Sequence, residues 1–261
     1  MFNIKLISID LDGTLLKNDL SVSTKCIQAI RHQKKNNVII VFNTSRPLKL
    51  LPEKLYEEFY DDYWILSNGG FCVKSGIKIF ENLIESESVK NLAQSFATLY
   101  QKTFFSIESN NEIFSSYQNL EKCSQYFAQQ ISEKDIEKKS ITKFLIIDEG
   151  VETICLQTLR SFLPVNAKLL VTDNNKYIQI MPKMASKLMG ILELIKGMDV
   201  SMENVLSFGD DLNDYELIKH CGIGVAMENA HCEIKKVSKY ITRSNEDNGI
   251  YHFLNKTVNL K

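Results

Sequence analysis

The fold of this chain is decided by a short stretch, KLISIDLDGTLL, at residues 5–16. Its first half is apolar, with Leu6, Ile7 and Ile9 close together, which is typical of a strand buried on both faces. The apolar run ends at Asp10 and continues as Leu-Asp-Gly-Thr. Asp and Gly are poor strand formers, and buried carboxylates are costly unless something pairs with them. Asp-Gly is also ordinary turn chemistry, so the rest of the chain must decide between a turn and a functional site.

The bulk properties are those of a soluble globular protein of one or two domains. The chain has 261 residues, of which 44% are hydrophobic and 24% charged. Its formal net charge of -1 provides no general attraction to nucleic acid or to an anionic membrane. We find no signal-peptide pattern and no apolar run near the roughly 20 residues of a membrane span. We therefore expect a cytoplasmic protein with neither nucleic acid nor membrane as a partner.

The cysteines and histidines carry no metal-binding or redox pattern. The four histidines lack metal-ligand spacing, and the cysteines form no CxxC pair. We expect reduced, small core residues at all six cysteine positions: Cys26, Cys72, Cys123, Cys155, Cys221 and Cys232.

Strand and helix patterns alternate through the first 80 residues and again after residue 186. Apolar strands are predicted at 4–10, 38–42 and 63–66, with helices at 24–35 and 48–60 and a hairpin about Ser75-Gly76. Late in the chain, a helix at 186–198 precedes short apolar runs at 204–209, 222–227 and 239–242. Such alternation is typical of a parallel sheet with crossover helices.

The middle of the chain has a different order of elements. Helices are predicted at 88–100, 120–130 and 151–162, and the strands between them include hairpins around Asn110-Asn111 and Asn174-Asn175. This order indicates an α+β module with an antiparallel sheet. We expect joints near residues 82–84 and 181–184, so that residues 1–82 and 184–261 form one domain and residues 83–183 an inserted second domain.

Polar residues close four of the expected strands, at positions 10–12, 44–46, 67–69 and 209–214. Ligands of open parallel sheets bind beyond the carboxyl ends of the strands, so these groups should meet at one edge. Three or four converging carboxylates would raise each other's pKa unless a cation lay between them, and oxygen ligands favour Mg²⁺.

An anion is expected beside that cation. Lys187 and the hydroxyls of Thr44 and Ser45 would supply positive charge and hydrogen-bond donors at the same edge. A carboxylate nucleophile, a magnesium site and an anion cradle together are typical of phosphoryl transfer.

Several motifs resemble those of the haloacid dehalogenase-like hydrolases. DLDGTL matches the first motif of this family, DxDGT, and SFGDDLNDYEL matches the fourth, GDxxND. VFNTSR and ASKLMG are similar to the second and third motifs in the Cof-type branch, and GVAMENA and NEDNGI to further stretches of it. The middle segment resembles the type-two cap in length and element order. The resemblance implies an α/β fold, with a Rossmann-like parallel-sheet core and an inserted α+β cap that sets substrate specificity.

The resemblance also implies a role for each motif residue. Asp10 would be the nucleophile that forms an aspartyl-phosphate, and Asp12 would protonate the leaving alcohol and then activate water. The implied magnesium ligands are Asp10, Asp12 through its backbone carbonyl, Asp210 and Asp214. The implied phosphate-binding residues are Leu11, Thr44, Ser45, Lys187 and Asn213.

Two positions depart from the family pattern without removing a catalytic group. Ser45 stands where the family usually has the Gly of TGR, and Glu228 where it usually has the Gly of GNA. We expect Ser45 to add a donor or tighten the phosphate loop. Arg46 is expected to be structural or near the substrate entrance rather than catalytic. Asp211 is predicted equally well as a helix N-cap or as a metal ligand.

The expected function is a Mg²⁺-dependent phosphatase acting on small phosphorylated metabolites, with sugar phosphates as the expected class. A phosphomutase or phosphotransferase with the same aspartyl-phosphate is the first alternative, because only the second acceptor differs. A phospho-accepting signalling module is a remote alternative, since its acid pair usually closes the first strand while the acceptor lies on a later one.

In the cap, four polar candidates for substrate contact are expected to be solvated surface residues: Glu108, Asn110, Lys143 and Lys176.

Overall fold

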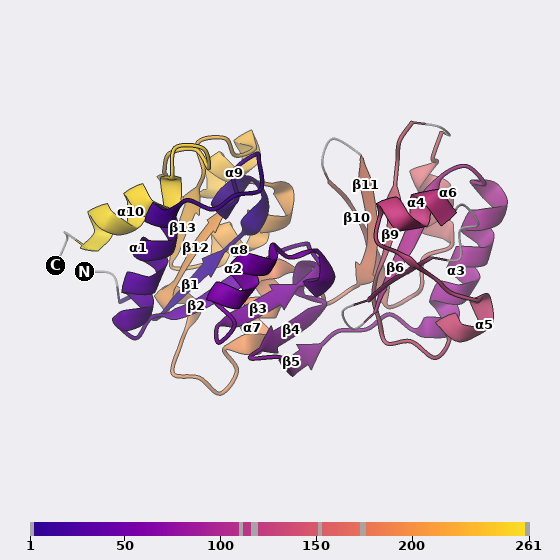
Figure 1. Cartoon of the computed structure of the whole chain (residues 1–261), viewed down its shortest axis with the longest axis horizontal. Helices are drawn as coiled ribbons and strands as arrows, with labels where there is room; N and C mark the ends of the chain where they lie inside the picture. The colour runs from indigo at the N-terminus through magenta and orange to yellow at the C-terminus, as the bar shows by residue number, and fades with distance from the viewer. Residues whose placement is uncertain (1–2, 110–111, 116–119, 151–152, 173–175, 259–261) are drawn as a thin grey trace. The chain divides into compact units, whose positions relative to one another are not determined.

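The computed structural model describes residues 3–109, 112–115, 120–150, 153–172 and 176–258 (Figure 1). The chain divides into two units, of residues 1–46, 51–80 and 186–261 and of residues 47–50 and 81–185. We call them the core unit and the cap unit. The unit boundaries lie a few residues from the joints expected near 82–84 and 181–184, and the short segment 47–50 groups with the cap unit.

The core unit is built on an eight-stranded sheet in the order β14-β13-β12-β1-β2-β3-β4-β5. In its middle, β1 (Leu6–Ile9) runs parallel to both of its neighbours, β12 (Val205–Gly209) and β2 (Ile39–Asn43). β3 and β4 run antiparallel. The remaining strands are β3 (Tyr63–Leu66), β4 (Phe71–Lys74), β5 (Ile77–Glu81), β13 (Ile223–Ala226) and β14 (Tyr240–Ile241). The predicted Rossmann-like parallel-sheet core is confirmed.

Alternating residues of these strands form two apolar faces. On one face, Leu6 and Val41 belong to a buried cluster with Ile191 of α7 and Leu217 of α8. On the other face, the ring of Phe208 packs edge-on against Phe253 of α10, with 5.5 Å between the centroids, and α10 lies beside α1 (Figure 1). Burial on both faces explains the near-continuous apolar runs of the central strands. The helices of the core unit are α1 (Thr24–Lys35), α2 (Glu53–Glu58), α7 (Lys187–Leu194), α8 (Tyr215–His220), α9 (Cys232–Val237) and α10 (Gly249–Val258).

The cap unit has a six-stranded sheet in the order β10-β11-β9-β6-β7-β8. Its pairs are antiparallel except that β7 and β8 run parallel. The strands are β6 (Phe104–Ser109), β7 (Glu112–Ser115), β8 (Gln129–Gln130), β9 (Ile141–Ile147), β10 (Ala167–Thr172) and β11 (Tyr177–Pro182). The helices are α3 (Ser86–Leu99), α4 (Leu120–Gln125), α5 (Glu133–Ile136) and α6 (Leu156–Ser161). The α+β composition expected for the inserted segment is observed.

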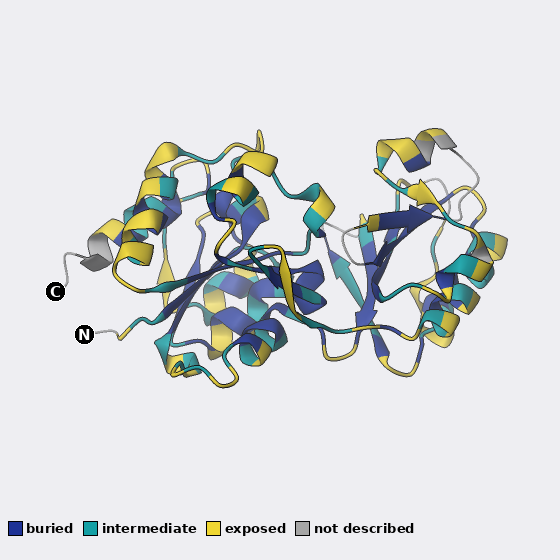
Figure 2. Ribbon diagram, turned by 60° about the horizontal axis from the view of Figure 1, so that its bottom comes forward, coloured by how far each residue is buried: buried dark blue, intermediate teal, exposed yellow. Residues whose placement is uncertain are grey.

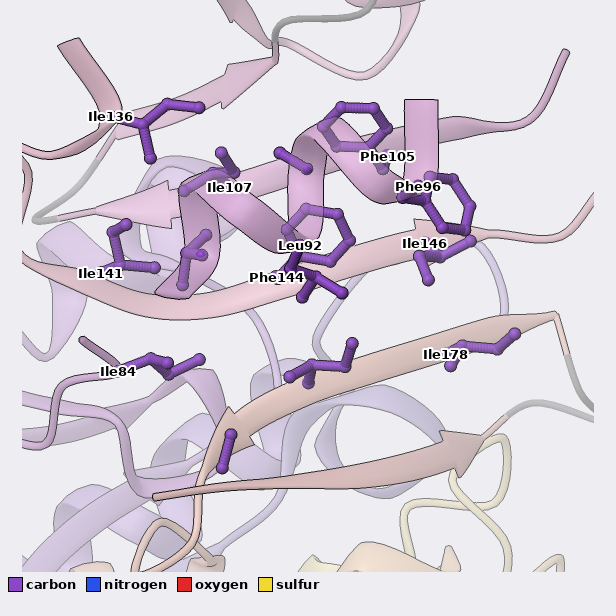
Figure 3. Close-up of a cluster of buried hydrophobic side chains, with 14 of the residues drawn as sticks. Ile84, Leu92, Phe96, Phe105, Ile107, Ile136, Ile141, Phe144, Ile146 and Ile178 are labelled. Carbon is purple, nitrogen blue, oxygen red and sulfur yellow. The ribbon is translucent and has the colours of Figure 1, made fainter. Parts of the chain in front are cut away.

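One face of the cap sheet packs against α3. Leu92 and Phe96 of this helix lie over Phe105, Phe144 and Ile146 of the sheet (Figure 3). The rings of Phe105 and Phe144 stack with 5.0 Å between their centroids. The cap unit therefore has a hydrophobic core of its own.

Four predicted helices are shorter than expected, and one of them, expected over 186–198, ends at Leu194. The helix expected over 48–60 is interrupted at Pro52, because proline lacks an N–H and restricts the residue before it. The one expected over 120–130 ends at Gln125, and residues 129–130 form β8 instead, after Phe127 at a positive φ of 56°. The helix expected over 151–162 begins only at Leu156; residues 151–152 lie outside the described part.

The expectation of solvated cap residues is wrong for Glu108 and Lys143. These residues face each other on β6 and β9, where the Lys143 Nζ lies 2.9 Å from Glu108 Oε1 and each side chain is 3% exposed. The strands that carry them are buried along nearly their whole length (Figure 2). Ion pairing makes the burial of both charges tolerable. Lys176 is exposed as expected, and Asn110 lies outside the described residues.

The cysteine expectation holds in part. All six cysteines are free, but Cys155 and Cys232 are exposed rather than part of the core.

Among the described residues, we find no helix with the length and apolar character needed to span a membrane.

Candidate active site

Asp10 follows directly after β1, the strand at the middle of the core sheet. Its amide donates a hydrogen bond to the carbonyl of Phe208 on β12 (3.3 Å). Residues 11–15 then form one irregular helical turn, in which Gly13 has a φ of 71°. A Cβ atom at Gly13 would lie 2.1 Å from Oδ2 of Asp210. The glycine therefore lets the turn pass directly beside a second acidic residue.

Lys187 opens α7 and reaches the acidic residues from that helix. The side chain of Ser186 caps the helix by accepting a hydrogen bond from the Met189 amide (3.1 Å). The Lys187 Nζ donates to Oδ1 of Asp10 (2.6 Å) and to Oδ1 of Asp214 (2.7 Å). Its side chain is only 1% exposed. The lysine is thus a buried cation held between two carboxylates, one from each of two strand ends.

Asp210 and Asp214 follow β12 and are held in different ways. Oδ1 of Asp210 accepts a hydrogen bond from the Thr14 hydroxyl (2.8 Å). Oδ2 of Asp214 accepts from the amides of Asp210 (3.2 Å) and Asp211 (3.3 Å). Asp211 occupies the N-cap position of the short turn Leu212–Asp214, in a capping box with Asp214. The N-cap prediction for Asp211 therefore matches its position.

Asp10 and Asp214 are buried and Asp210 is partly buried, and this burial shifts the pKa values of the three carboxyl groups around Lys187. Burial, followed by the charge of Asp214, raises the pKa of Asp210 to about 7. Burial also raises the pKa of Asp10 and of Asp214, although the charge of Lys187 opposes it. For Lys187, burial alone would lower the pKa, but Asp10 and Asp214 outweigh it and raise the pKa. The site carries more negative charge than Lys187 can balance.

This donor set fits a divalent cation that prefers oxygen. Asp10, Asp210 and Asp214 each offer a carboxylate oxygen, and these atoms lie within 4.8 Å of one another; Asp211 is not in this group. Oxygen donors without sulfur or imidazole are typical of Mg²⁺ sites. Both oxygens of Asp214 already accept hydrogen bonds, so Asp10 and Asp210 are the more available ligands. Whether the Asp12 carbonyl or Asp214 ligates a metal stays a prediction.

The predicted phosphate-binding residues lie at the ends of the same strands or open α7. Thr44 directly follows β2, is fully buried, and its hydroxyl accepts a hydrogen bond from the Arg46 amide (3.1 Å). The Asn213 Nδ2 donates to Oδ1 of Asn68 (3.0 Å), which follows β3. Leu11 is buried and Ser45 is partly buried. The contacts of these residues with a phosphate stay predictions. The structure gives their positions at the strand ends, which does not test what they bind.

Comparison with known proteins agrees with this geometry. A family model described as haloacid dehalogenase-like hydrolase matches residues 7–254. The chain belongs to this family. The family predicted from the sequence motifs is thereby confirmed.

Relatives of this hydrolase match over nearly their whole length. A candidate phosphatase of Streptococcus pyogenes, M6_Spy0533, is 27% identical, and the match covers 98% of this chain and 99% of the relative. The 5-amino-6-(5-phospho-D-ribitylamino)uracil phosphatase YcsE of Bacillus subtilis is 26% identical over 95% of this chain and 93% of its own. The solved structure of BT4131, described as a subclass IIB sugar phosphatase of this superfamily, has a TM-score of 0.81 at 22% identity and covers 97% of this chain and 98% of that chain. At this identity, the last likeness concerns the fold.

Sequence reasoning about this hydrolase missed the partner of Asp12. Arg46 Nε donates to Oδ2 of Asp12 (2.8 Å), and its Nη2 donates to Oδ1 (2.6 Å). The two residues are 34 positions apart, so no local pattern reports the contact. The available signal is Arg46 as the last residue of the second-motif stretch VFNTSR, but the sequence predicts a structural residue or one near the substrate entrance.

Two late motifs hold the turn that carries Asp12. The side chain of Asn229 donates to the carbonyl of Gly13 (2.7 Å), and its oxygen accepts from the amide of Asn245 (3.1 Å). The side chain of Asn245 donates to the carbonyl of Leu16 (2.9 Å). GVAMENA and NEDNGI, known from the sequence only as family-like stretches, therefore brace the first motif. Glu228, beside Asn229, is exposed.

Proposed function

We propose that this hydrolase is a Mg²⁺-dependent phosphatase that acts on small phosphorylated metabolites, sugar phosphates foremost, through an aspartyl-phosphate on Asp10. The observation that carries the proposal is the buried bridge of Lys187 between Asp10 and Asp214. This bridge leaves one carboxylate at the end of the central strand beside a fixed positive charge. Such an arrangement suits a nucleophile that must approach an anionic phosphoryl group.

The proposed reaction has two steps. In the first, an oxygen of Asp10 attacks phosphorus, the bond to the leaving oxygen breaks, and Asp12 gives that oxygen a proton. Lys187 holds the Asp10 carboxylate in place, and Thr44 and Asn213 would bind phosphoryl oxygens. In the second step, water attacks phosphorus, Asp12 takes its proton, and the bond to Asp10 breaks to release inorganic phosphate.

A magnesium ion would be held by Asp10 and Asp210, with Asp214 and the Asp12 carbonyl as further candidates. Bound there, it would supply positive charge to the phosphoryl group and relieve repulsion among the carboxylates. The raised pKa values of Asp10, Asp210 and Asp214 support this assignment, because burial disfavours the charged carboxylates and a bound cation would favour them.

The substrate class is proposed from the cap unit and from the relatives. An inserted unit of this kind can limit access to small substrates and contact the leaving group. Two of the relatives are described as acting on a phosphoribityl compound and on sugar phosphates. Six free cysteines are in keeping with a reducing compartment, and we propose the cytoplasm.

The decisive experiment measures release of free phosphate from p-nitrophenyl phosphate and from a panel of phosphorylated metabolites. We expect turnover with Mg²⁺, loss of turnover with chelator, and none with Asp10→Asn. Phosphate that appears on a second alcohol instead of in solution would identify a phosphotransferase or mutase. Full activity in a strong chelator would contradict the magnesium assignment.

A further inference from the structure

The guanidinium of Arg46 binds both oxygens of the Asp12 carboxylate, at 2.8 Å from Nε and 2.6 Å from Nη2. Paired N–H bonds of this kind fix the plane of a carboxylate as well as its position. The Asp12 side chain is 45% exposed and that of Arg46 22% exposed. The pair therefore lies at an accessible margin of the site.

The fold anchors the backbone on both sides of this contact. The Arg46 amide donates to the Thr44 hydroxyl (3.1 Å), and its carbonyl accepts from the Ser67 amide (3.1 Å), so its backbone is fastened to two strand ends. Asp12 belongs to the irregular turn after β1, next to Gly13. With both backbones anchored, the two N–H bonds of the guanidinium orient the Asp12 carboxylate.

We infer that Arg46 is a positioning residue that holds Asp12 as the proton acceptor of the second step, an inference that rests on the proposed function. The two N–H bonds hold the Asp12 carboxylate in one orientation for that proton transfer. In that step water oxygen bonds to phosphorus, its proton passes to Asp12, and the phosphorus–oxygen bond to Asp10 breaks with its electrons returning to Asp10.

The test compares the two steps in Arg46→Met, a variant with a side chain of similar length and no charge. With p-nitrophenyl phosphate and Mg²⁺, we expect kcat to fall about tenfold or more, within the range for loss of a positioned acid or base. KM should fall in proportion, so that kcat/KM is unchanged, because kcat/KM reports the first step. A burst of nitrophenolate and covalent phosphate on Asp10 should appear. Arg46→Lys, or added guanidinium with Arg46→Ala, should restore part of kcat.

The matched control is Arg31→Met. Arg31 also makes two bonds to one carboxylate, that of Glu58, at 2.5 Å each, but lies outside the site. It should leave the burst and kcat unchanged. A second control is the Asp12→Asn background, in which Arg46→Met should add no further loss of kcat if Arg46 acts through Asp12.

Three outcomes would overturn the inference. A loss in kcat/KM that grows with the basicity of the leaving group would assign Arg46 to the first step. A full further loss in the Asp12→Asn background would show that Arg46 acts on the phosphoryl group instead. Unchanged kcat in folded Arg46→Met would remove the role altogether. A wild-type protein that releases phosphate from no substrate would instead reject the proposed function itself, and this inference with it.

Discussion

Single residues set the charge balance of this site. Lys187 places an ammonium group in the cluster of Asp10, Asp210 and Asp214, and it bonds two of the three. Burial raises the pKa of all three carboxyl groups, and repulsion from Asp214 adds to the rise for Asp10 and Asp210. The same carboxyl groups that suit a divalent ion make the stability of the metal-free protein sensitive to pH.

Stability without metal should therefore fall as pH rises. The pKa of Asp210 is raised to about 7 from 3.8, so the folded state binds a proton that the unfolded state has lost. This contribution to the free energy of unfolding is complete below pH 3.8 and is lost as pH rises through about 7. In chelator, urea unfolding between pH 5 and 8 should show this decline, and Mg²⁺ should stabilise more at pH 8 than at pH 5.

Two variants separate this effect from other titrations. Asp210→Asn should flatten the decline, because its amide does not ionise. Asp199→Asn should leave the decline intact, because Asp199 is an exposed partner of Lys5 with a lowered pKa. An identical pH profile for wild type and Asp210→Asn would show that Asp210 is not the titrating group.

The assignment of Asp12 makes its own prediction. Asp12→Asn should slow turnover by roughly 100- to 10,000-fold for alkyl phosphates, because the leaving alcohol loses its proton donor. The first step should suffer less with a nitrophenolate leaving group, which needs little protonation. Burst amplitudes and kcat/KM for a series of leaving groups provide the measurement. An equal loss of kcat/KM across the series would refute the general-acid role.

At the scale of elements, the turn after β1 fits against the end of β12 with little room. Gly13→Ala should abolish turnover and lower Tm, because a Cβ atom there would lie 2.1 Å from Oδ2 of Asp210. Gly197→Ala is the matched control: its φ is also positive, at 78°, but nothing lies within 4 Å. The control should cost about 1 kcal/mol from backbone strain alone and keep full kcat. Equal losses for the two variants would show that strain, not contact with Asp210, is the cause.

The buried ion pair of the cap sheet should contribute strongly to its stability. Lys143→Met leaves the Glu108 charge buried without this partner and should cost about 3–5 kcal/mol in the free energy of unfolding. Adding Glu108→Gln should recover part of that loss, because the glutamine side chain places no charge at this buried position. Lys138→Met removes an exposed pair with Asp135 in the same unit and should cost less than about 1 kcal/mol. Chemical denaturation of the four proteins checks the ranking.

At the scale of the whole molecule, the chain separates into a unit with the proposed chemistry and a unit with its own core. Deleting residues 84–182 and closing the gap with a short Gly/Ser bridge should leave Asp10, Thr44, Lys187 and Asp210 in the core unit. We expect the remainder to bind Mg²⁺ and beryllium fluoride but to lose discrimination among phosphorylated metabolites, with slower turnover because water is less excluded. A folded deletion variant that ranks sugar phosphates as the full chain does would place specificity in the core unit.

The sequence by itself determined the layout of the core unit and the place of its site. Apolar runs of strand length, separated by helical periodicity, imply parallel strands, and parallel strands bring their carboxyl ends to one edge. Asp10, Thr44 and Asp210 can therefore be grouped from the sequence alone. These inferences depend only on local patterns, which short segments of sequence carry in full.

Only the tertiary structure decided which side chains meet across distant segments. Arg46 binds Asp12, Asn229 binds the Gly13 carbonyl, and Lys143 pairs with Glu108 in the cap sheet. A polar side chain in a strand has the same local pattern whether it faces water or a buried partner. Its burial depends on strand register and on what packs over the sheet, and neither is encoded within the few residues around it.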